Sequence, residues 1–326
     1  MLSHNTTNIS QLRQMCIAAR IRNAHTIKPK LWPVQTSPRP SRFFSSIRLT
    51  RIQPQTYFRT LTTMSTIPGD NPVCCTIPPV ASDYKPKGAF ETINGISTYV
   101  IGDKSSKKAI VVTMDVFGMV PLTQQGCDIL ASQGFYVLMP DFLGDQALQN
   151  GDVPFNTPEK VEKRNKLFSG VGNPQARATD LVKLGEKLKS EGFTVGSIGY
   201  CWGGKVIMIA GASDAFAAVA GVHPSLLAPE DAANCKAAVG LYPTKDEDPT
   251  AMEPFVKIAK DYKLYSDAYH GWSHSSLLSS PLPTVLLVGF AAARAQLDDP
   301  HYKAQYEDVY TRLSAFFKKH LASAKL

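Results

Sequence analysis

Residues 194–212 of the chain read TVGSIGYCWGGKVIMIAGA. The apolar run at residues 194–199 predicts a buried strand, and Lys205–Ala212 predicts a helix that follows it almost at once. Cys201 lies between them, with glycines on both sides. A sharp turn from a strand into a helix strains the backbone at its tip, and neighbouring glycines leave room for the turn. The stretch therefore predicts a nucleophile elbow with Cys201 at its tip.

The helix expected after this bend gives the cysteine a chemical role. The first N–H groups of a helix carry partial positive charge, which favours a thiolate over a thiol and offers a donor to an oxyanion. Cys201 is therefore the candidate nucleophile. The alternative interpretation is a buried structural cysteine beside a glycine-packed turn.

Short apolar runs alternate with helical patterns on both sides of this stretch. Asn94-Gly95, between Ala89–Ile93 and Ile96–Ile101, predicts a tight turn and so an antiparallel hairpin. Strands that alternate with helices need crossover connections, which make a mostly parallel sheet with helices on both faces. We therefore expect an α/β fold that opens with an antiparallel hairpin. The further runs expected as strands are Ala109–Met114, Phe135–Met139, Ala217–Val222, Ala237–Leu241 and Lys263–Ala268.

Charge divides the chain into two parts. Residues 1–66 hold ten Lys or Arg side chains and no Asp or Glu, so the formal net charge of +8 leaves residues 67–326 at −2. A basic, acid-free start rich in Ser and Thr is typical of a mitochondrial transit peptide. We expect residues 1–66 to be a disordered leader and linker, and residues 67–326 to form one domain. If translation starts instead at Met64, the protein is expected in the cytoplasm.

Composition argues against several classes of protein. The slightly negative charge of residues 67–326 does not support a nucleic-acid-binding face, and no apolar run approaches the ~20 residues of a membrane-spanning helix. Six cysteines are too few and too scattered for a disulfide framework, and the sequence has no C-x-x-C pair for a metal. We expect no metal, no cofactor, and a monomer or small homo-oligomer.

Candidates for an acid and a base follow the cysteine along the chain, in the order that such an elbow requires. Asp246 comes just after an expected strand, with Glu247 and Asp248 as rivals, and an exposed acidic loop is the alternative. His270 follows the last expected strand, and His274 lies one turn of chain later. Either imidazole could reach the thiol, so both stay candidates.

Four motifs of the chain resemble the dienelactone hydrolase family, also called the carboxymethylenebutenolidases. They are Gly-Tyr-Cys-Trp-Gly-Gly at 199–204, Met-Asp-Val-Phe-Gly at 114–118, Met-Pro-Asp at 139–141 and Tyr-His-Gly-Trp at 269–272. The resemblance spans roughly residues 72–322 and implies an α/β-hydrolase fold. It also implies an enzyme that cleaves a small ester or enol-lactone through a Cys-Asp-His triad and a thioester intermediate.

The resemblance implies roles for individual residues. Cys201, Asp246 and His270 would form the triad, because the catalytic histidine of the family is followed by Gly and an aromatic residue.

Three further residues receive roles from the resemblance. The backbone N–H groups of Trp202 and Val116 would form the oxyanion hole. Asp115 stands where the family often has a Glu that holds the resting thiol until substrate binds.

The chain departs from the family after the histidine. A substrate-binding arginine usually follows the His-Gly-aromatic motif within a few residues, whereas Ser273–Phe290 separate that motif from Arg294 here. We interpret the extra segment as an inserted loop or an untrimmed intron of the gene model. One way of removing it joins His274 to Gly289, so the choice between His270 and His274 stays open.

Other functions are compatible with the same elbow. Glutamine amidotransferases have a similar cysteine motif and a downstream His-x-Glu, but no His of this chain has Glu two residues later. A thioesterase or another acyl-transfer enzyme would use the same residues. A catalytically silent hydrolase fold that binds a small molecule is the third alternative.

Overall fold

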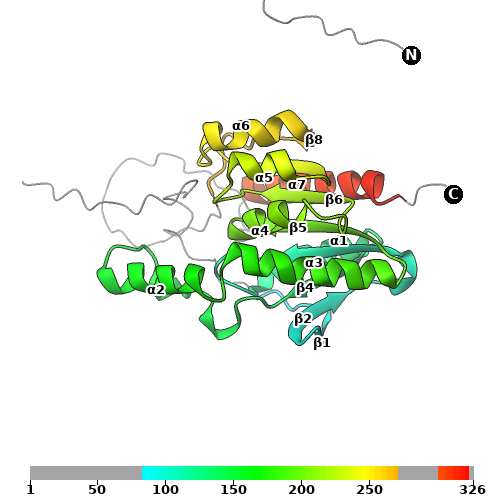
Figure 1. Cartoon of the computed structure of the whole chain (residues 1–326), viewed down its shortest axis with the longest axis horizontal. Coiled ribbons are helices and arrows are strands. Elements are labelled where there is room, and N and C mark those ends of the chain that lie inside the picture. The colour runs from blue at the N-terminus through cyan, green and yellow to red at the C-terminus, as the bar shows by residue number, and fades with distance from the viewer. Residues whose placement is uncertain (1–82, 271–299, 323–326) are drawn as a thin grey trace, which may run out of the picture. The chain divides into compact units, whose positions relative to one another are not determined.

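The computed structural model describes residues 83–270 and 300–322 of the chain. These residues contain a sheet of eight strands in the order β1-β2-β4-β3-β5-β6-β7-β8 (Figure 1). The β1–β2 and β2–β4 pairs are antiparallel, and the other pairs are parallel. The strands are β1 (Ala89–Ile93), β2 (Ile96–Ile101), β3 (Lys108–Thr113), β4 (Tyr136–Pro140), β5 (Thr194–Tyr200), β6 (Ala218–Val222), β7 (Ala238–Tyr242) and β8 (Ala259–Tyr262).

Helices cover both faces of this sheet, as expected. Helices α3 and α4 pack together on the face nearer the viewer in Figure 1, where α4 contacts β3, β5 and β6. Helices α1 and α7 pack together on the opposite face, with α1 against β4 and α7 against β6 and β7. The helices of the described ranges are α1 (Pro121–Ser132), α2 (Pro158–Ser169), α3 (Pro174–Ser190), α4 (Trp202–Ala210), α5 (Pro229–Asn234), α6 (Pro249–Ile258) and α7 (Pro300–His320).

The hairpin at the start of the sheet has the turn that its sequence predicts. Asn94 has φ 50° and Gly95 has φ 80°, and the two residues join β1 to β2 in register. A two-residue turn with positive φ at both positions matches the twist of the strands that it connects. The antiparallel start of an otherwise parallel sheet is therefore confirmed.

The last expected strand, Lys263–Ala268, is wrong. Helix α6 ends at Ile258 and the chain enters β8 at once, so the pairing with β7 uses Ala259–Tyr262. Beyond β8 the pairing is reduced to an isolated bridge between Tyr265 and Thr244, where the N–H of Tyr265 donates to Pro243. A turn follows, in which the N–H of Ala268 donates to Tyr265. Tyr265 and Ala268 are buried although they lie outside a strand. Apolar character therefore could not distinguish this segment from a buried strand.

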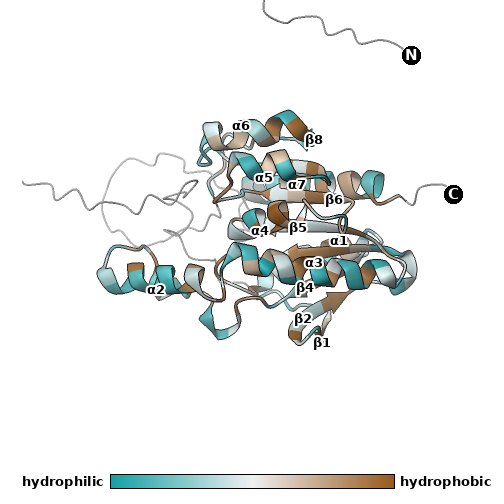
Figure 2. Cartoon of the chain, in the orientation of Figure 1, coloured by the Kyte–Doolittle hydropathy of each residue, from teal (hydrophilic) through white to brown (hydrophobic). Residues whose placement is uncertain are grey.

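The apolar core lies along the middle strands. Every residue of β4 and β6 is buried, as a strand covered by helices on both faces requires. Figure 2 shows brown on the central strands and alternating teal and brown along α3. Edge strand β1 is mostly exposed, so the core is built by the parallel part of the sheet.

Two expectations concern parts of the chain beyond this sheet. The expected leader, residues 1–66, lies outside the described residues. Within residues 83–270 and 300–322, no helix has the length and apolarity needed to cross a membrane.

Candidate active site

Cys201 occupies a strained bend between β5 and α4. Its backbone has φ 53° and ψ −117°, a positive φ that non-glycine residues adopt at a cost of ~1–3 kcal/mol. Hydrogen bonds hold the bend in place: the N–H of Cys201 donates to Val222 at 3.2 Å, and its carbonyl accepts from Gly204 at 2.9 Å. The expected sharp bend from strand to helix is therefore present, and Cys201 is at its tip.

The glycines around the cysteine are required by close backbone contacts. A Cβ on Gly199 would lie 2.1 Å from the carbonyl oxygen of Gly203, and one on Gly203 would lie 2.4 Å from that of Thr113. A Cβ on Gly204 would lie 2.5 Å from the Pro224 side chain. Helix α4 can thus start directly after β5 only when these positions lack a side chain.

His270 is fully buried in the loop after β8, and its ring is bound by a carboxylate. Nδ1 lies 2.5 Å from Oε1 of Glu247. Burial lowers the pKa of the imidazole, but the negative charges of Cys201 and Glu247 outweigh burial and raise this pKa from 6.5 to about 9. Cys201 and Glu247 thus both raise the pKa of this imidazole, and Glu247 is bonded to its Nδ1.

The carboxylate on the imidazole is Glu247 rather than the expected Asp246. Asp246 lies beside the same loop, but its Oδ2 accepts the backbone N–H of His270 at 2.9 Å. The second oxygen of Glu247 accepts the backbone N–H of Thr244, which folds the loop so that the longer side chain faces the ring. Both acids position the histidine, one through its main chain and one through its ring.

The residues expected around an oxyanion come from neighbouring parallel strands. Val116 follows β3 and Trp202 begins α4 after β5, and both are buried. Nε1 of Trp202 donates to the carbonyl of Gly172 at 2.8 Å, which ties α4 to the start of α3. The first N–H groups of a helix lack acceptors within it, and the role of the Trp202 N–H toward an oxyanion stays a prediction.

Asp115, the expected gating residue, is buried beside Val116. Its Oδ1 accepts the N–H of Phe117 at 2.8 Å, and its carbonyl accepts from Gly118 at 3.2 Å. The short side chain thus shapes the turn after β3.

Two residues that the sequence did not single out as reactive lie beside the cysteine and the histidine. Oγ of Ser225 is 3.6 Å from Sγ of Cys201, and the ring of His223 meets that of His270 edge-on at 4.9 Å between centroids. Both follow β6, which pairs with β5. Polar residues at the ends of neighbouring parallel strands meet at one sheet edge. The place of these two residues just after an expected strand could therefore have marked them as site residues.

Other expected site residues lie outside the described ranges. These are Arg294, His274 and the segment Ser273–Phe290. Their roles stay predictions.

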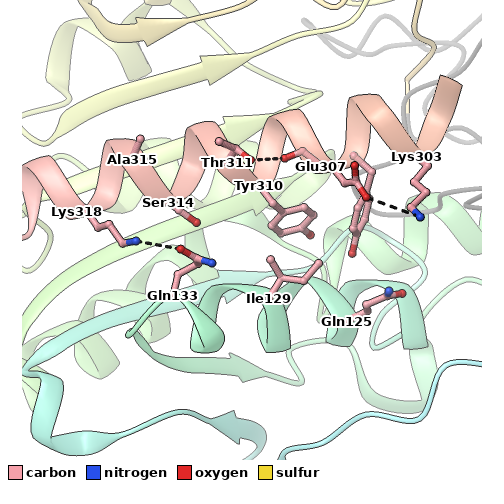
Figure 3. A pocket seen from close by; sticks show the side chains of 11 residues that line it. Gln125, Ile129, Gln133, Lys303, Glu307, Tyr310, Thr311, Ser314, Ala315 and Lys318 are labelled. Atoms are coloured by element: carbon pink, nitrogen blue, oxygen red, sulfur yellow. Dashed lines mark hydrogen bonds and ion pairs between the residues drawn. The ribbon is translucent and has the colours of Figure 1, made fainter. Parts of the chain in front are cut away.

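The described residues also contain a groove away from this edge. It has a volume of about 560 Å³ and lies between α1 and α7 (Figure 3), and it is lined by none of the residues placed around Cys201. Its Tyr310 shares a hydrogen bond of 2.7 Å with Tyr200, the residue before Cys201. In residues 83–270 and 300–322, no cluster of His, Cys, Asp and Glu could hold a metal ion.

A cysteine elbow and a buried histidine on a parallel sheet with helices on both faces define an α/β-hydrolase. A protein of Klebsiella pneumoniae subsp. pneumoniae MGH 78578, assigned as a dienelactone hydrolase, superposes with a TM-score of 0.51. The two chains are 18% identical, and the match covers 71% of this chain and 98% of the other. At this identity the likeness shows the fold alone.

The family is shown by sequence comparison. Residues 96–321 match the Dienelactone hydrolase family, so the chain belongs to this family and the resemblance seen in its motifs is confirmed. An uncharacterized AIM2 family protein of Schizosaccharomyces pombe is 30% identical over 240 residues, which are 70% of this chain and 89% of that protein. An endo-1,3;1,4-β-D-glucanase of Zea mays is 33% identical over 157 residues, 48% of each chain.

The elbow geometry predicts that Gly203 tolerates no side chain. In Gly203→Ala the new Cβ would meet the Thr113 carbonyl at 2.4 Å, so we expect a loss of ~3 kcal/mol or more in the free energy of unfolding. Gly151→Ala is the matched control, because a Cβ there meets nothing within 4 Å. Urea unfolding of both variants checks this, and equal midpoints would contradict the role of the glycine.

The carboxylate contacts predict different effects of two neighbouring acids. Glu247→Gln removes the negative charge on the imidazole, so the pKa of His270 should fall from about 9. Asp246→Asn keeps an oxygen that can accept the N–H of His270, so the pKa should change little. Nitrogen NMR of labelled histidine across pH 5–10 measures the pKa of His270 in both variants. A larger fall of this pKa in Asp246→Asn than in Glu247→Gln would show that Asp246 is the acid that acts on the ring.

Proposed function

We propose that the protein hydrolyses small activated esters or enol-lactones, with Cys201 as nucleophile and His270 as general acid and base. The observation that carries the proposal is the arrangement at the elbow: a strained cysteine at a helix start and a fully buried imidazole whose pKa is raised by that cysteine and by Glu247. Covalent catalysis by cysteine requires a thiolate activated in this way.

Acylation follows from this arrangement. The thiolate of Cys201 attacks the carbonyl carbon, and the carbonyl electron pair moves onto oxygen to form a tetrahedral oxyanion. The N–H groups of Trp202 and Val116 stabilise that charge as it develops. When the oxyanion collapses, the ester C–O bond breaks, the leaving oxygen takes the proton of the His270 imidazolium, and a thioester remains on Cys201.

Deacylation uses the same histidine in its neutral form. His270 takes a proton from water, and the resulting hydroxide attacks the thioester carbonyl. Collapse of the second oxyanion breaks the C–S bond, releases the carboxylic acid and restores the thiolate beside the imidazolium. Glu247 keeps Nδ1 protonated throughout, so that Nε2 faces the reacting atoms.

The chemistry of sulfur favours particular substrates. A thiolate is a good leaving group, so a tetrahedral intermediate returns to substrate unless the other group leaves at least as readily. Enolates and phenolates meet this condition, whereas amines do not. We therefore propose lactones and activated esters as the substrate class.

The relation to a glucanase suggests a second reaction, which the site favours less. Most glycosidases need two carboxyl groups on opposite sides of the scissile bond, one of them free to act as an acid. Here Glu247 is bound to the imidazole and to the Thr244 N–H, and Asp246 is bound to the His270 N–H. The acids of this loop thus serve the histidine, and we propose ester cleavage.

The proposal predicts that ester hydrolysis depends on one thiol. Cys201→Ala should reduce kcat/KM for p-nitrophenyl acetate by ~1,000-fold or more, because the covalent route is lost. Steady-state kinetics measured by p-nitrophenolate release check this.

Cys127→Ala is the matched control for that experiment. Cys127 is a second buried cysteine, and burial raises the pKa of its thiol, so it stays neutral and unreactive. Its removal should leave kcat/KM within about twofold of the original value. Equal rates in the original chain and in Cys201→Ala would sink the proposal and favour a catalytically silent binding protein.

A further inference from the structure

The segment that follows β6 is held against the elbow by its backbone. His223, Pro224 and Ser225 make the turn, with positive φ at His223 (37°) and, just beyond the segment, at Leu226 (61°). The N–H of His223 donates to Tyr242 of β7 at 2.9 Å, and the N–H of Ser225 donates to the Cys201 carbonyl at 3.0 Å. The segment is therefore fixed between β7 and the bend at Cys201.

The side chain of Ser225 meets the sulfur from this fixed position. Its Oγ lies 3.6 Å from Sγ, and the serine is 3% exposed and the cysteine 0% exposed. A neutral thiol can donate its proton to the hydroxyl, but a thiolate has no proton to give. In the thiolate state the hydroxyl must therefore be the donor.

A hydroxyl in this position has a different effect from a carboxylate. A carboxylate near the sulfur would oppose ionisation of the thiol through its own negative charge. A hydroxyl carries no net charge and stabilises the thiolate by donating a hydrogen bond, and bonds of this charge-assisted kind are stronger than those between neutral groups. The contact thus favours the reactive form of the cysteine.

We propose that Ser225 is a positioning residue for Cys201, whose hydroxyl holds Sγ at the elbow and donates to it in the thiolate state. This inference rests on the proposed function and deepens it, because it assigns how the nucleophile is kept ready before substrate arrives. The hydroxyl acts with the imidazolium of His270, which supplies the positive charge.

Several titratable groups lie at the same sheet edge. They are His270 after β8, Asp246 and Glu247 after β7, His223 after β6, and Asp115 after β3. A serine-to-alanine change alters none of them, and it removes one neutral donor. A change in the pH dependence of the thiol therefore reports the hydroxyl itself.

The test measures alkylation of the thiol and needs no ester. The full chain is treated with iodoacetamide from pH 5 to 10, and modification of the peptide that contains Cys201 is followed by mass spectrometry. In Ser225→Ala the pH profile should move to higher pH, with a rate at pH 7 reduced by roughly tenfold, the typical effect of one lost hydrogen bond to a charged group. Ser225→Thr keeps the hydroxyl and should restore most of the rate.

Ser314→Ala is the matched control. It removes another buried hydroxyl, on α7 in the groove of Figure 3, and should reproduce the original profile. Urea midpoints confirm that the variants are folded, and Ser225→Gly replaces Ser225→Ala if the latter does not fold. If the alkylation profiles of the original chain, Ser225→Ala and Ser225→Gly coincide, the inference is overturned.

The two proposals fail in different ways. If alkylation depends on Ser225 but p-nitrophenyl acetate is not hydrolysed, the proposed function is wrong and the role of the hydroxyl toward the thiolate stands. If hydrolysis depends on Cys201 but the alkylation profile ignores Ser225, only the present inference is wrong.

Discussion

The positive φ of Cys201 is the constraint on which the rest of the site depends. A residue can be held at φ 53° only if the backbone around it is fixed, and here β6 and the first turn of α4 both bond to the bend. The same bend requires glycines, because the carbonyls of Thr113 and Gly203 lie where their side chains would be. Strain at one residue thus determines the packing of α4 against the centre of the sheet.

The charged groups at the elbow are stabilised by neighbouring side chains rather than by solvent. The imidazole of His270 is fully buried, which alone would lower its pKa, yet Cys201 and the carboxylate of Glu247 raise that pKa. An ion pair of this kind is costly to assemble and strong once assembled, since little water screens it. The loops after β7 and β8 supply the backbone bonds that hold its members together.

The parts of the molecule that follow local rules could be predicted from the sequence. The turn at Asn94-Gly95, the glycine-flanked cysteine and the alternation of strands and helices all express short-range geometry, and each was confirmed. The sequence favoured Asp246 as the partner of the imidazole, whereas Glu247 bonds the ring, because adjacent loop residues differ only in where the folded loop aims them. Ser225 was not singled out, although its place after β6 was a signal, because its contact with Cys201 joins two loops that only the folded sheet brings together.

The hydroxyl contact between Tyr200 and Tyr310 links the elbow to α7, the last helix in the described sequence. Tyr200 precedes the reactive cysteine, whereas Tyr310 belongs to α7, which a ribosome makes after every other described element. The support beneath the elbow is therefore completed late in synthesis. A nascent chain that lacks α7 leaves the phenol of Tyr200 without this partner, so the contact behind the elbow forms only after α7 has been made.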